Sequence, residues 1–207
     1  MNIVIIGQGG HSKVIIDMIR INECFKIIAF LDDKFNDILS NEDIFYGPIS
    51  AYKFLIDQYK DIKFIVAIGN NQIRKQIVES LNLEAFDYMT IVHPSAIISP
   101  SVMIGKGTLI MANTVINADT MIGDHVIINT GSIIEHDNKV NDFSHVSPNA
   151  TLTGNVYIGE GVHIGACATL IPSVQVGAWS VIGAGAVVIN SIPENRTAVG
   201  VPAKIKK

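Results

Sequence analysis

The composition of this 207-residue chain, 48% hydrophobic and 16% charged, predicts folded domains and excludes a disordered protein. A net charge of −4 gives no general basic surface for nucleic acid, and no apolar run reaches the roughly 18 residues of a membrane span. No basic segment precedes the apolar start of the chain, and the two cysteines lie in different segments. We therefore expect a cytoplasmic protein with no signal peptide and no disulfide.

Residues 1–84 are predicted to form a small α/β domain. Apolar runs at 2–6, 26–31 and 64–68 are typical of buried strands. Apolar residues at helical spacing follow them around 14–19, near 50–58 and over 72–81, and Tyr46-Gly47-Pro48 is expected to be a turn. Strands that alternate with helices predict a Rossmann-like parallel sheet, in which ligands bind at the carboxyl ends of the strands.

A glycine-rich turn, Gly7-Gln8-Gly9-Gly10-His11-Ser12, separates the first predicted strand from the first helix. Free N–H groups at the start of a helix can bind a phosphate, and Asp32 follows Gly7 at a distance suited to a ribose or base contact. A plain tight turn explains the same residues. Because Ser12 replaces the third glycine of the dinucleotide fingerprint and the domain is short, a single nucleotide fits better than a dinucleotide.

From Val92 to Val188 every sixth residue is aliphatic, with no break in register. Neither the helix period of 3.6 nor the strand period of two explains this spacing, whereas a hexapeptide β-helix does. We expect three six-residue sides per coil, with each aliphatic side chain pointing inward over its counterpart one coil later. Gly or Asn often follows the aliphatic residue, as at Gly105 and Asn117, and is expected to occupy a tight corner with positive φ.

The largest polar interruption of this ladder is Glu135-His136-Asp137-Asn138-Lys139. His136 comes two residues after the inward-pointing Ile134, so it should reach outward near a corner. An adjacent Asp can hold an imidazole in one tautomer, and a neutral His is the usual general base near pH 7, contributing roughly 10²–10⁴-fold. From these residues alone, a general base and a solvated charged corner are both open.

His145 and His163 precede inward aliphatic residues, so they should face outward and stack one coil apart. A zinc site is the rival reading of such a column. It requires three or four converging ligands, and the H-x4-H pair of β-helical carbonic anhydrases is absent from the sequence. We therefore expect no metal.

Six motifs in order resemble one family over nearly the whole chain. They are Gly7–His11, Phe30–Asp33, Ala67–Asn71, Ile128–His136, Ser144–Ser147 and Val199–Lys204. Together they resemble the hexapeptide acetyltransferases of bacterial nucleotide-linked amino sugars, the bacillosamine-type and perosamine-type N-acetyltransferases. The sialic acid O-acetyltransferases share the same layout. The resemblance implies a left-handed parallel β-helix, a homotrimer with active sites between subunits, and acetyl-CoA bound between neighbouring β-helices.

The resemblance also implies roles for the two regions and for single residues. Residues 1–84 would bind the nucleotide sugar, and residues 85–207 would be the catalytic, acetyl-CoA-binding domain. By position, His136 matches the base, Asp137 the acidic residue that orients it, and Asn129 the residue that helps to hold the acceptor amine. Many relatives have Glu where this chain has the shorter Asp137.

The remaining matched positions are contacts to the two substrates. The acetyl-CoA contacts are His145 near the acetyl group, Gly154 with the N–H that polarises the thioester carbonyl, Gly165, Ala184, Val201, Pro202 and Lys204. The nucleotide-sugar contacts are Gly9, Gly10, His11, Asp32, Asp33, Gly69 and Asn70.

The sequence therefore predicts transfer of an acetyl group from acetyl-CoA to the C4 amine of a UDP-linked 4-amino-4,6-dideoxy sugar, in bacterial surface-glycan synthesis. The first alternative is O-acetylation of a sialic acid, which would use the same residues. The second is a trimeric β-helical nucleotide-binding scaffold without catalysis, for which a degenerate His-Asp corner would be expected.

Overall fold

The structure is a computed structural model that describes residues 1–206. It divides into two compact units, one from Met1 to Ile91 and the other from Val92 onward.

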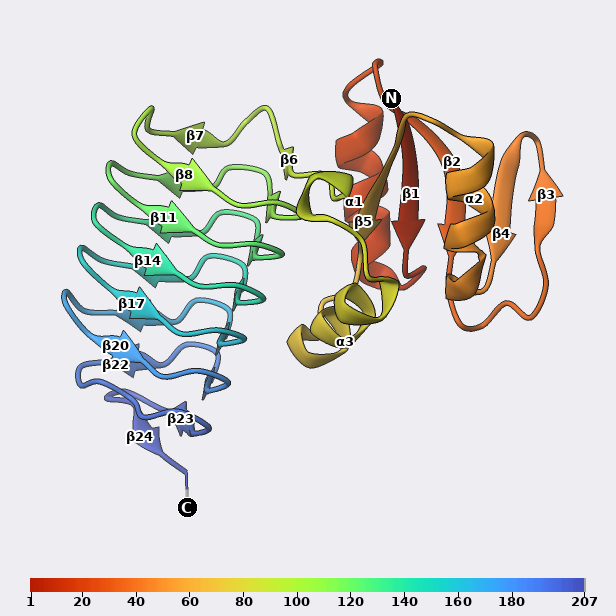
Figure 1. The fold of residues 1–207 in the computed structure, drawn as a ribbon. Coiled ribbons are helices and arrows are strands. Elements are labelled where there is room, and N and C mark those ends of the chain that lie inside the picture. The colour runs from red at the N-terminus through yellow and green to blue at the C-terminus, as the bar shows by residue number, and fades with distance from the viewer. Residues whose placement is uncertain (207) are drawn as a thin grey trace. The chain divides into compact units, whose positions relative to one another are not determined.

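The first unit is built around a five-stranded sheet in the order β3-β4-β2-β1-β5 (Figure 1). Its strands are β1 (Asn2–Ile6), β2 (Lys26–Leu31), β3 (Leu39–Asn41), β4 (Ile44–Gly47) and β5 (Ile62–Val66). Its helices are α1 (Gly10–Arg20), α2 (Tyr52–Gln58) and α3 (Asn71–Leu81), with single 3-10 turns at η1 (Ile49–Ala51) and η2 (Ala85–Asp87). The strands β1, β2, β4 and β5 run parallel, which confirms the predicted Rossmann-like sheet.

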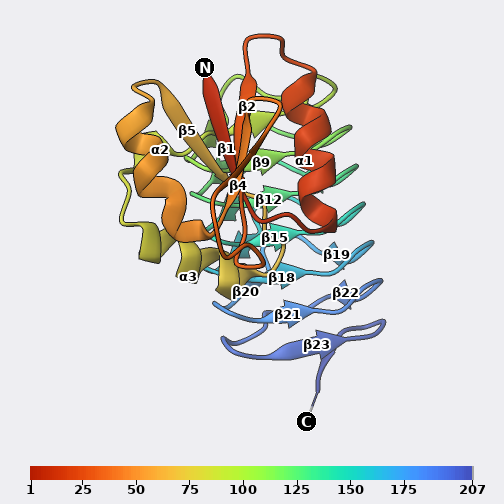
Figure 2. The ribbon, with the colours of Figure 1, turned by 90° about the vertical axis from the view of Figure 1, so that its right-hand side faces the viewer.

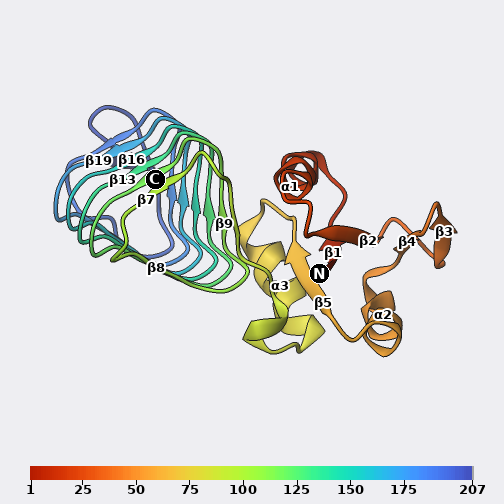
Figure 3. The ribbon, with the colours of Figure 1, turned by 90° about the horizontal axis from the view of Figure 1, so that it is seen from above.

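Helices cover both faces of this sheet, with α1 on one face and α2 and α3 on the other (Figure 3). Val4 and Ile6 of β1 belong to the same buried cluster as Leu55 of α2 and Leu81 of α3. A strand covered on both faces needs apolar residues at successive positions, which explains the unbroken aliphatic run of β1.

The sequence prediction was wrong at the hairpin β3–β4. Tyr46 and Gly47, expected to be a turn, belong to β4, which pairs with β2. The turn lies instead at Glu42 and Asp43, which have φ values of 48° and 66°. β3 is short and largely polar, and the four residues of β4 end in Tyr46-Gly47 before Pro48, a sequence typical of a turn. The third predicted strand, expected at 64–68, begins and ends slightly earlier in the chain as β5.

The first unit also extends beyond residue 84, where we expected it to end. Tyr88 forms a parallel bridge with Phe64 of β5, and the Met89 N–H donates to the Phe64 carbonyl at 2.9 Å. Because these bonds continue the sheet, the boundary between the units lies at Ile91.

The second unit is a β-helix of short strands in three sheets, parallel throughout except for the final antiparallel pair β23–β24. The first sheet holds β7 (Ile97–Ile98), β10 (Val115–Ile116), β13 (Ile133–Ile134), β16 (Thr151–Leu152), β19 (Thr169–Leu170) and β22 (Val187–Val188). The second holds β8 (Met103–Ile104), β11 (Met121–Ile122), β14 (Lys139–Val140), β17 (Tyr157–Ile158) and β20 (Gln175–Val176). The third holds β6 (Ile91–Val92), β9 (Leu109–Ile110), β12 (Ile127–Ile128), β15 (His145–Val146), β18 (His163–Ile164), β21 (Val181–Ile182), β23 (Thr197–Val199) and β24 (Lys204–Ile205). Figure 2 shows the coils of this third sheet stacked in sequence order, from β9 to β23.

The six-residue ladder forms the core of the solenoid, as predicted. Ile134 pairs with Ile116 on the preceding coil and with Leu152 on the following coil. From Ile110 to Val188 every ladder residue is at most 4% exposed, whereas Val92 at the start is 43% exposed. Burial of each such aliphatic side chain contributes about 1.5–3 kcal/mol, so the ladder holds the corners of successive coils in fixed register.

The prediction was wrong about which corner residue has positive φ. The left-handed residues come three positions after each aliphatic, for example Asn113, Asp119 and Asp137, with φ values of 58°, 60° and 59°. The glycine directly after the aliphatic serves a different purpose. A Cβ on Gly159 would lie 2.6 Å from the backbone nitrogen of Ala178, so glycine there permits close approach of the next coil.

Small side chains two residues before each aliphatic are buried and, where they carry a hydroxyl, link adjacent coils. Thr108 Oγ1 donates to the Gly123 carbonyl at 2.8 Å, and Thr120 Oγ1 donates to the Glu135 carbonyl at 2.9 Å. Each bond satisfies a carbonyl at a corner, where the strand ladder is interrupted.

Within residues 1–206, every helix is too short or too polar to cross a membrane.

Candidate active site

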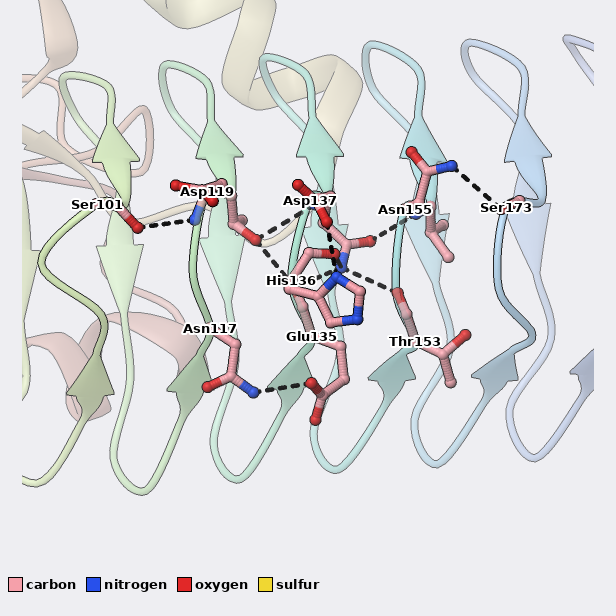
Figure 4. Close-up of polar contacts among 12 residues, drawn as sticks. Ser101, Asn117, Asp119, Glu135, His136, Asp137, Thr153, Asn155 and Ser173 are labelled. Carbon is pink, nitrogen blue, oxygen red and sulfur yellow. Dashed lines mark hydrogen bonds and ion pairs between the residues drawn. The ribbon is translucent and has the colours of Figure 1, made fainter.

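The ladder presents His136 and Asp137 together at the corner between β13 and β14 (Figure 4). Asp137 occupies the left-handed position of that corner, with a φ of 59°, a conformation that Asp tolerates better than most residues. Its Oδ2 lies 2.7 Å from His136 Nδ1. The two side chains are 61% and 58% exposed in the single chain, so the pair is accessible to a substrate.

This contact determines which nitrogen of His136 can act as a base. An ionised carboxylate only accepts hydrogen bonds, so the proton of the neutral ring lies on Nδ1 and the lone pair on Nε2. The hydrogen bond that His136 donates to Asp137, reinforced by the negative charges of Asp137 and Glu135, raises the pKa of His136 above its usual value. The corner therefore carries an imidazole more basic than a free one, with Nε2 pointing away from its partner.

The imidazole of His136 lies against Gly154 on the next coil. A Cβ added to Gly154 would be 2.8 Å from Nε2 and Cε1 of the ring, so any larger residue would have to displace the imidazole. Within residues 1–206 the Gly154 N–H donates no hydrogen bond. The structure thus brings a base into contact with a residue whose backbone N–H is unbonded within the described residues, a combination suited to acyl transfer.

Asn129, predicted to hold the acceptor amine, lies at a different corner, between β12 and β13. Its Nδ2 is 3.1 Å from His145 Nε2. The rings of His145 and His163 are stacked 4.9 Å apart, which confirms the predicted column. His145 is only 8% exposed, so its ring is covered rather than open to solvent.

The remaining predicted acetyl-CoA contacts follow the same edge of the solenoid as Asn129. Gly165 directly follows β18, and a Cβ there would lie 2.5 Å from the nitrogen of Ala184 on the next coil. Val201 and Pro202 form the link between β23 and β24, and Lys204 begins β24. Val201 is 73% exposed, so this link is open to solvent in the single chain. The predicted site residues therefore divide between two edges of one solenoid.

In the first unit, the glycine-rich turn leads directly into α1. Gly9 precedes the helix and Gly10 begins it, and a Cβ on either would meet no atom within 4 Å, so the turn has free space around it. Asp32, expected to contact a ribose or base, also supports this turn. Its Oδ2 accepts from the Gln8 N–H at 2.6 Å, while Oδ1 accepts from the Lys34 N–H at 3.1 Å. The neighbouring Asp33 is exposed.

At the end of β5, Gly69 and Asn70 form the start of α3. Asn70 caps the helix, with Oδ1 accepting from the Ile73 N–H at 3.0 Å. A Cβ on Gly69 would meet no atom within 4 Å. The turns after β1, β2 and β5 are at the carboxyl edge of one parallel sheet, where ligands of such folds bind.

The sequence reading missed a buried cation at this edge, Arg74. It is 1% exposed and donates to the Ile68 carbonyl at 2.9 Å and to Asn71 Oδ1 at 3.0 Å. Burial lowers its pKa to about 9, and burial together with the charge of Arg74 lowers the pKa of His11 to about 4. His11 is thus neutral at pH 7. The signal was available, because Arg74 precedes the apolar Leu81 by seven residues, two helical turns, and so shares its face of α3.

No group of three or more His, Cys, Asp or Glu side chains suited to a metal ion occurs in the part of the chain that the structure describes.

Family models match both units. Residues 2–81 match the model described as the PglD N-terminal domain. Residues 101–136 and 155–190 match the model described as the bacterial transferase hexapeptide (six repeats).

Solved structures similar to this chain include acetyltransferases. The chain is 36% identical to a mutant of perosamine N-acetyltransferase from Caulobacter crescentus in complex with CoA and GDP-perosamine, with a TM-score of 0.90 over 100% of this chain and 97% of that one. It is 34% identical to the acetyltransferase domain of PglB from Neisseria gonorrhoeae FA1090 in complex with acetyl coenzyme A, with a TM-score of 0.86 and coverage of 99% and 98%.

Among curated proteins, the chain is 48% identical over 111 residues to UDP-N-acetylbacillosamine N-acetyltransferase of Bacillus subtilis (strain 168). That match covers 54% of this chain and 51% of the relative, so the chain spans about half the length of the curated relatives it matches. Both family models match, and the chain covers nearly all of the Caulobacter structure. The chain therefore belongs to the family of hexapeptide-repeat sugar acetyltransferases that includes the perosamine and bacillosamine N-acetyltransferases.

Proposed function

We propose that the protein transfers an acetyl group from acetyl-CoA to the C4 amine of a nucleotide-linked 4-amino-4,6-dideoxy sugar. The observation that carries this proposal is the contact between the imidazole of His136 and the backbone of Gly154 on the next coil. One group can accept a proton from an attacking amine, and the other can bind the oxyanion that forms. The relatives support it, since their structures contain CoA with GDP-perosamine or acetyl coenzyme A.

The reaction proceeds by direct attack, without an acyl-enzyme. The neutral C4 amine attacks the thioester carbon, the carbonyl π electrons move to oxygen, and His136 Nε2 accepts a proton from the nitrogen. The Gly154 N–H binds the oxyanion, and one such donor is worth about 3 kcal/mol. Collapse of the tetrahedral intermediate breaks the C–S bond. The CoA thiolate then takes the proton from the imidazolium, which regenerates the base.

The imidazolium that forms during attack is stabilised by Asp137. Its carboxylate already accepts the Nδ1 hydrogen at 2.7 Å, so the positive charge of the ring develops next to a fixed negative charge. We assign Asn129 to the acceptor amine and His145 to the acetyl group, with Gly165, Ala184 and Val201–Lys204 along the CoA chain.

We infer that the active site is completed by a second chain, in a homotrimer. The base corner and the edge that carries Asn129, Gly165 and Ala184 are different edges of one solenoid. In such a trimer, the edge of one subunit that carries Asn129 would lie beside the corner of its neighbour that carries His136. Sedimentation of the purified protein measures the state directly, and a monomer that retains full activity would contradict the inference.

The first unit binds the nucleotide sugar in this proposal. Gly9, Gly10 and His11 lie at the start of α1, where free N–H groups suit a diphosphate. Asp32 and Asp33 follow β2, and Gly69 and Asn70 follow β5, at the same edge of the sheet. We propose UDP as the nucleotide, in line with the Bacillus relative, and a product used in bacterial surface-glycan synthesis.

Thiol release from acetyl-CoA tests the proposal. The purified protein is assayed with UDP-linked and GDP-linked 4-amino sugars and with free sialic acid, and mass spectrometry determines whether the product is an amide or an ester. Turnover with a 4-amino sugar nucleotide is expected. Turnover with sialic acid alone would favour the O-acetyltransferase, and no turnover with any acceptor would favour a non-catalytic scaffold.

A further inference from the structure

Asn138 is the unusual residue in the row of small side chains inside the solenoid. At six-residue spacing from Thr108 to Ala186, the other members of this row are Thr, Ser, Ala or Val. Asn138 is 1% exposed, directly beneath the corner that carries His136 and Asp137. A primary amide in an aliphatic core is costly unless it is fully hydrogen-bonded, so its bonds indicate what it holds.

The side chain of Asn138 is bonded on both sides. Its Nδ2 lies 2.6 Å from the Glu135 carbonyl, 3.3 Å from the His136 carbonyl and 3.0 Å from the Thr153 carbonyl. Its Oδ1 accepts from the Val156 N–H at 3.0 Å. The two hydrogens of the amide are thus shared among three carbonyls, two in its own corner and one in the next coil.

The hydroxyl groups in the same row reach less of the structure. Thr120, one coil before Asn138, donates to the Glu135 carbonyl and accepts from the Asn138 N–H. Thr108 likewise donates to the Gly123 carbonyl and accepts from the Val126 N–H, so both hydroxyls bond to the next coil and not to their own corner. Only the longer amide of Asn138 also bonds to the carbonyl of the His136 residue itself.

The contact with Thr153 bears on the proposed oxyanion donor. The Thr153 carbonyl and the Gly154 N–H belong to one planar peptide group, so a bond that fixes the carbonyl also fixes the direction of the N–H. A hydrogen bond to that carbonyl further polarises the peptide and makes its N–H a stronger donor.

We propose that Asn138 is a positioning residue that sets the imidazole of His136 and the N–H of Gly154 in register with each other. It bonds to the backbone of the base on one coil and to the peptide of the donor on the next. This inference rests on the proposed function, because it assigns Asn138 a task in acetyl transfer.

Two substitutions and one matched control test it. Asn138→Ala removes every side-chain contact. Asn138→Thr copies Thr120, so it should fold and retain a bond to the next coil, but it loses the contact to the His136 carbonyl. Thr108→Ala, in the same row but at another corner, removes a core hydroxyl that bonds to the Gly123 carbonyl and the Val126 N–H.

We expect Asn138→Ala to lower kcat by at least about tenfold, with KM for both substrates within about twofold, because misplacement of reacting groups affects the chemical step. Asn138→Thr should recover part of that loss, and Thr108→Ala should keep the wild-type kcat. The carbonyl stretch of ¹³C-acetyl-CoA bound to the protein should move toward the free value in Asn138→Ala and stay in place in Thr108→Ala.

Either of two results overturns the inference while the proposed function stands. The first is that the wild type is active and that Asn138→Thr, and Asn138→Ala if it folds, have the same kcat as the wild type. The other is an equal loss of kcat in Thr108→Ala, which would indicate a general effect of core stability. A wild-type protein that releases no thiol with any acceptor overturns the proposed function, and this inference with it.

Discussion

Replacement of His136 by alanine removes the proposed base and leaves the solenoid intact. The side chain is 61% exposed and, within residues 1–206, its only polar contact is with Asp137, so little stability depends on it. General-base catalysis is worth roughly 10²–10⁴-fold, which corresponds to about 3–5 kcal/mol of transition-state stabilisation. Because Gly154 and the substrate contacts remain, we expect kcat to fall by about 10²-fold or more while KM for acetyl-CoA changes little.

The assay is continuous thiol release with a saturating 4-amino sugar nucleotide. His93→Ala is the matched control, because it removes another solenoid histidine, whose ring nitrogen Nδ1 hydrogen-bonds to the neighbouring Ser95. It should keep kcat within about twofold of the wild type, the scatter expected of a neutral surface change. Added imidazole should restore part of the His136→Ala activity, since the exposed corner leaves room for it. Wild-type turnover in His136→Ala would refute the assignment of His136 as base.

Three further variants probe the same two units. Asp137→Asn removes the negative charge that raises the pKa of His136. The rising limb of kcat/KM against pH reports deprotonation of the base, so it should move to lower pH and reach a lower plateau. A limb that does not shift would contradict this cause of the raised pKa. Gly154→Ala places a methyl group 2.8 Å from His136 Nε2, and it should cut kcat at least about tenfold without loss of the circular-dichroism signal; unchanged kcat would show that the ring moves aside freely. His11 has a folded pKa of about 4 against 6.5 unfolded, so the unfolded state binds more protons between these values and stability falls as the pH drops from 6.5 to 4. His11→Gln should remove about 1–2 kcal/mol of that loss between pH 7 and 5 in urea unfolding, and an identical slope in both proteins would refute the shift.

The β-helix could be predicted from sequence because its core repeats at a fixed interval. Every sixth residue meets the same environment, so a single pattern determined both the strands and their stacking. The hairpin β3–β4 follows no such repeat. It pairs because Phe45 and Tyr46 meet β2 in space, and their packing against Phe54 and Phe30 is not visible in the local sequence.

Contacts at the candidate site could be predicted where the partners are adjacent in sequence, and less completely where they are not. The contact between His136 and Asp137 is local, and Asp137 lies at a left-handed corner that holds it in place. Gly154 entered the prediction only through family resemblance, although it follows His136 by one full coil and this spacing could have indicated the contact. Arg74 escaped because a charged residue on a helix is ordinarily taken to face solvent, and here the carbonyl groups that hold it come from the preceding turn.

The one-coil separation of His136 and Gly154 makes this chain unequally tolerant of changes in length. A whole extra coil added between Ile98 and Ile116 would leave the two residues in contact, because every later position shifts together. A single residue added between 136 and 154 would slide one coil past the other and separate them. Length variation among proteins built on this plan is therefore expected in whole coils outside residues 136–154, and in loops that leave the corners aligned.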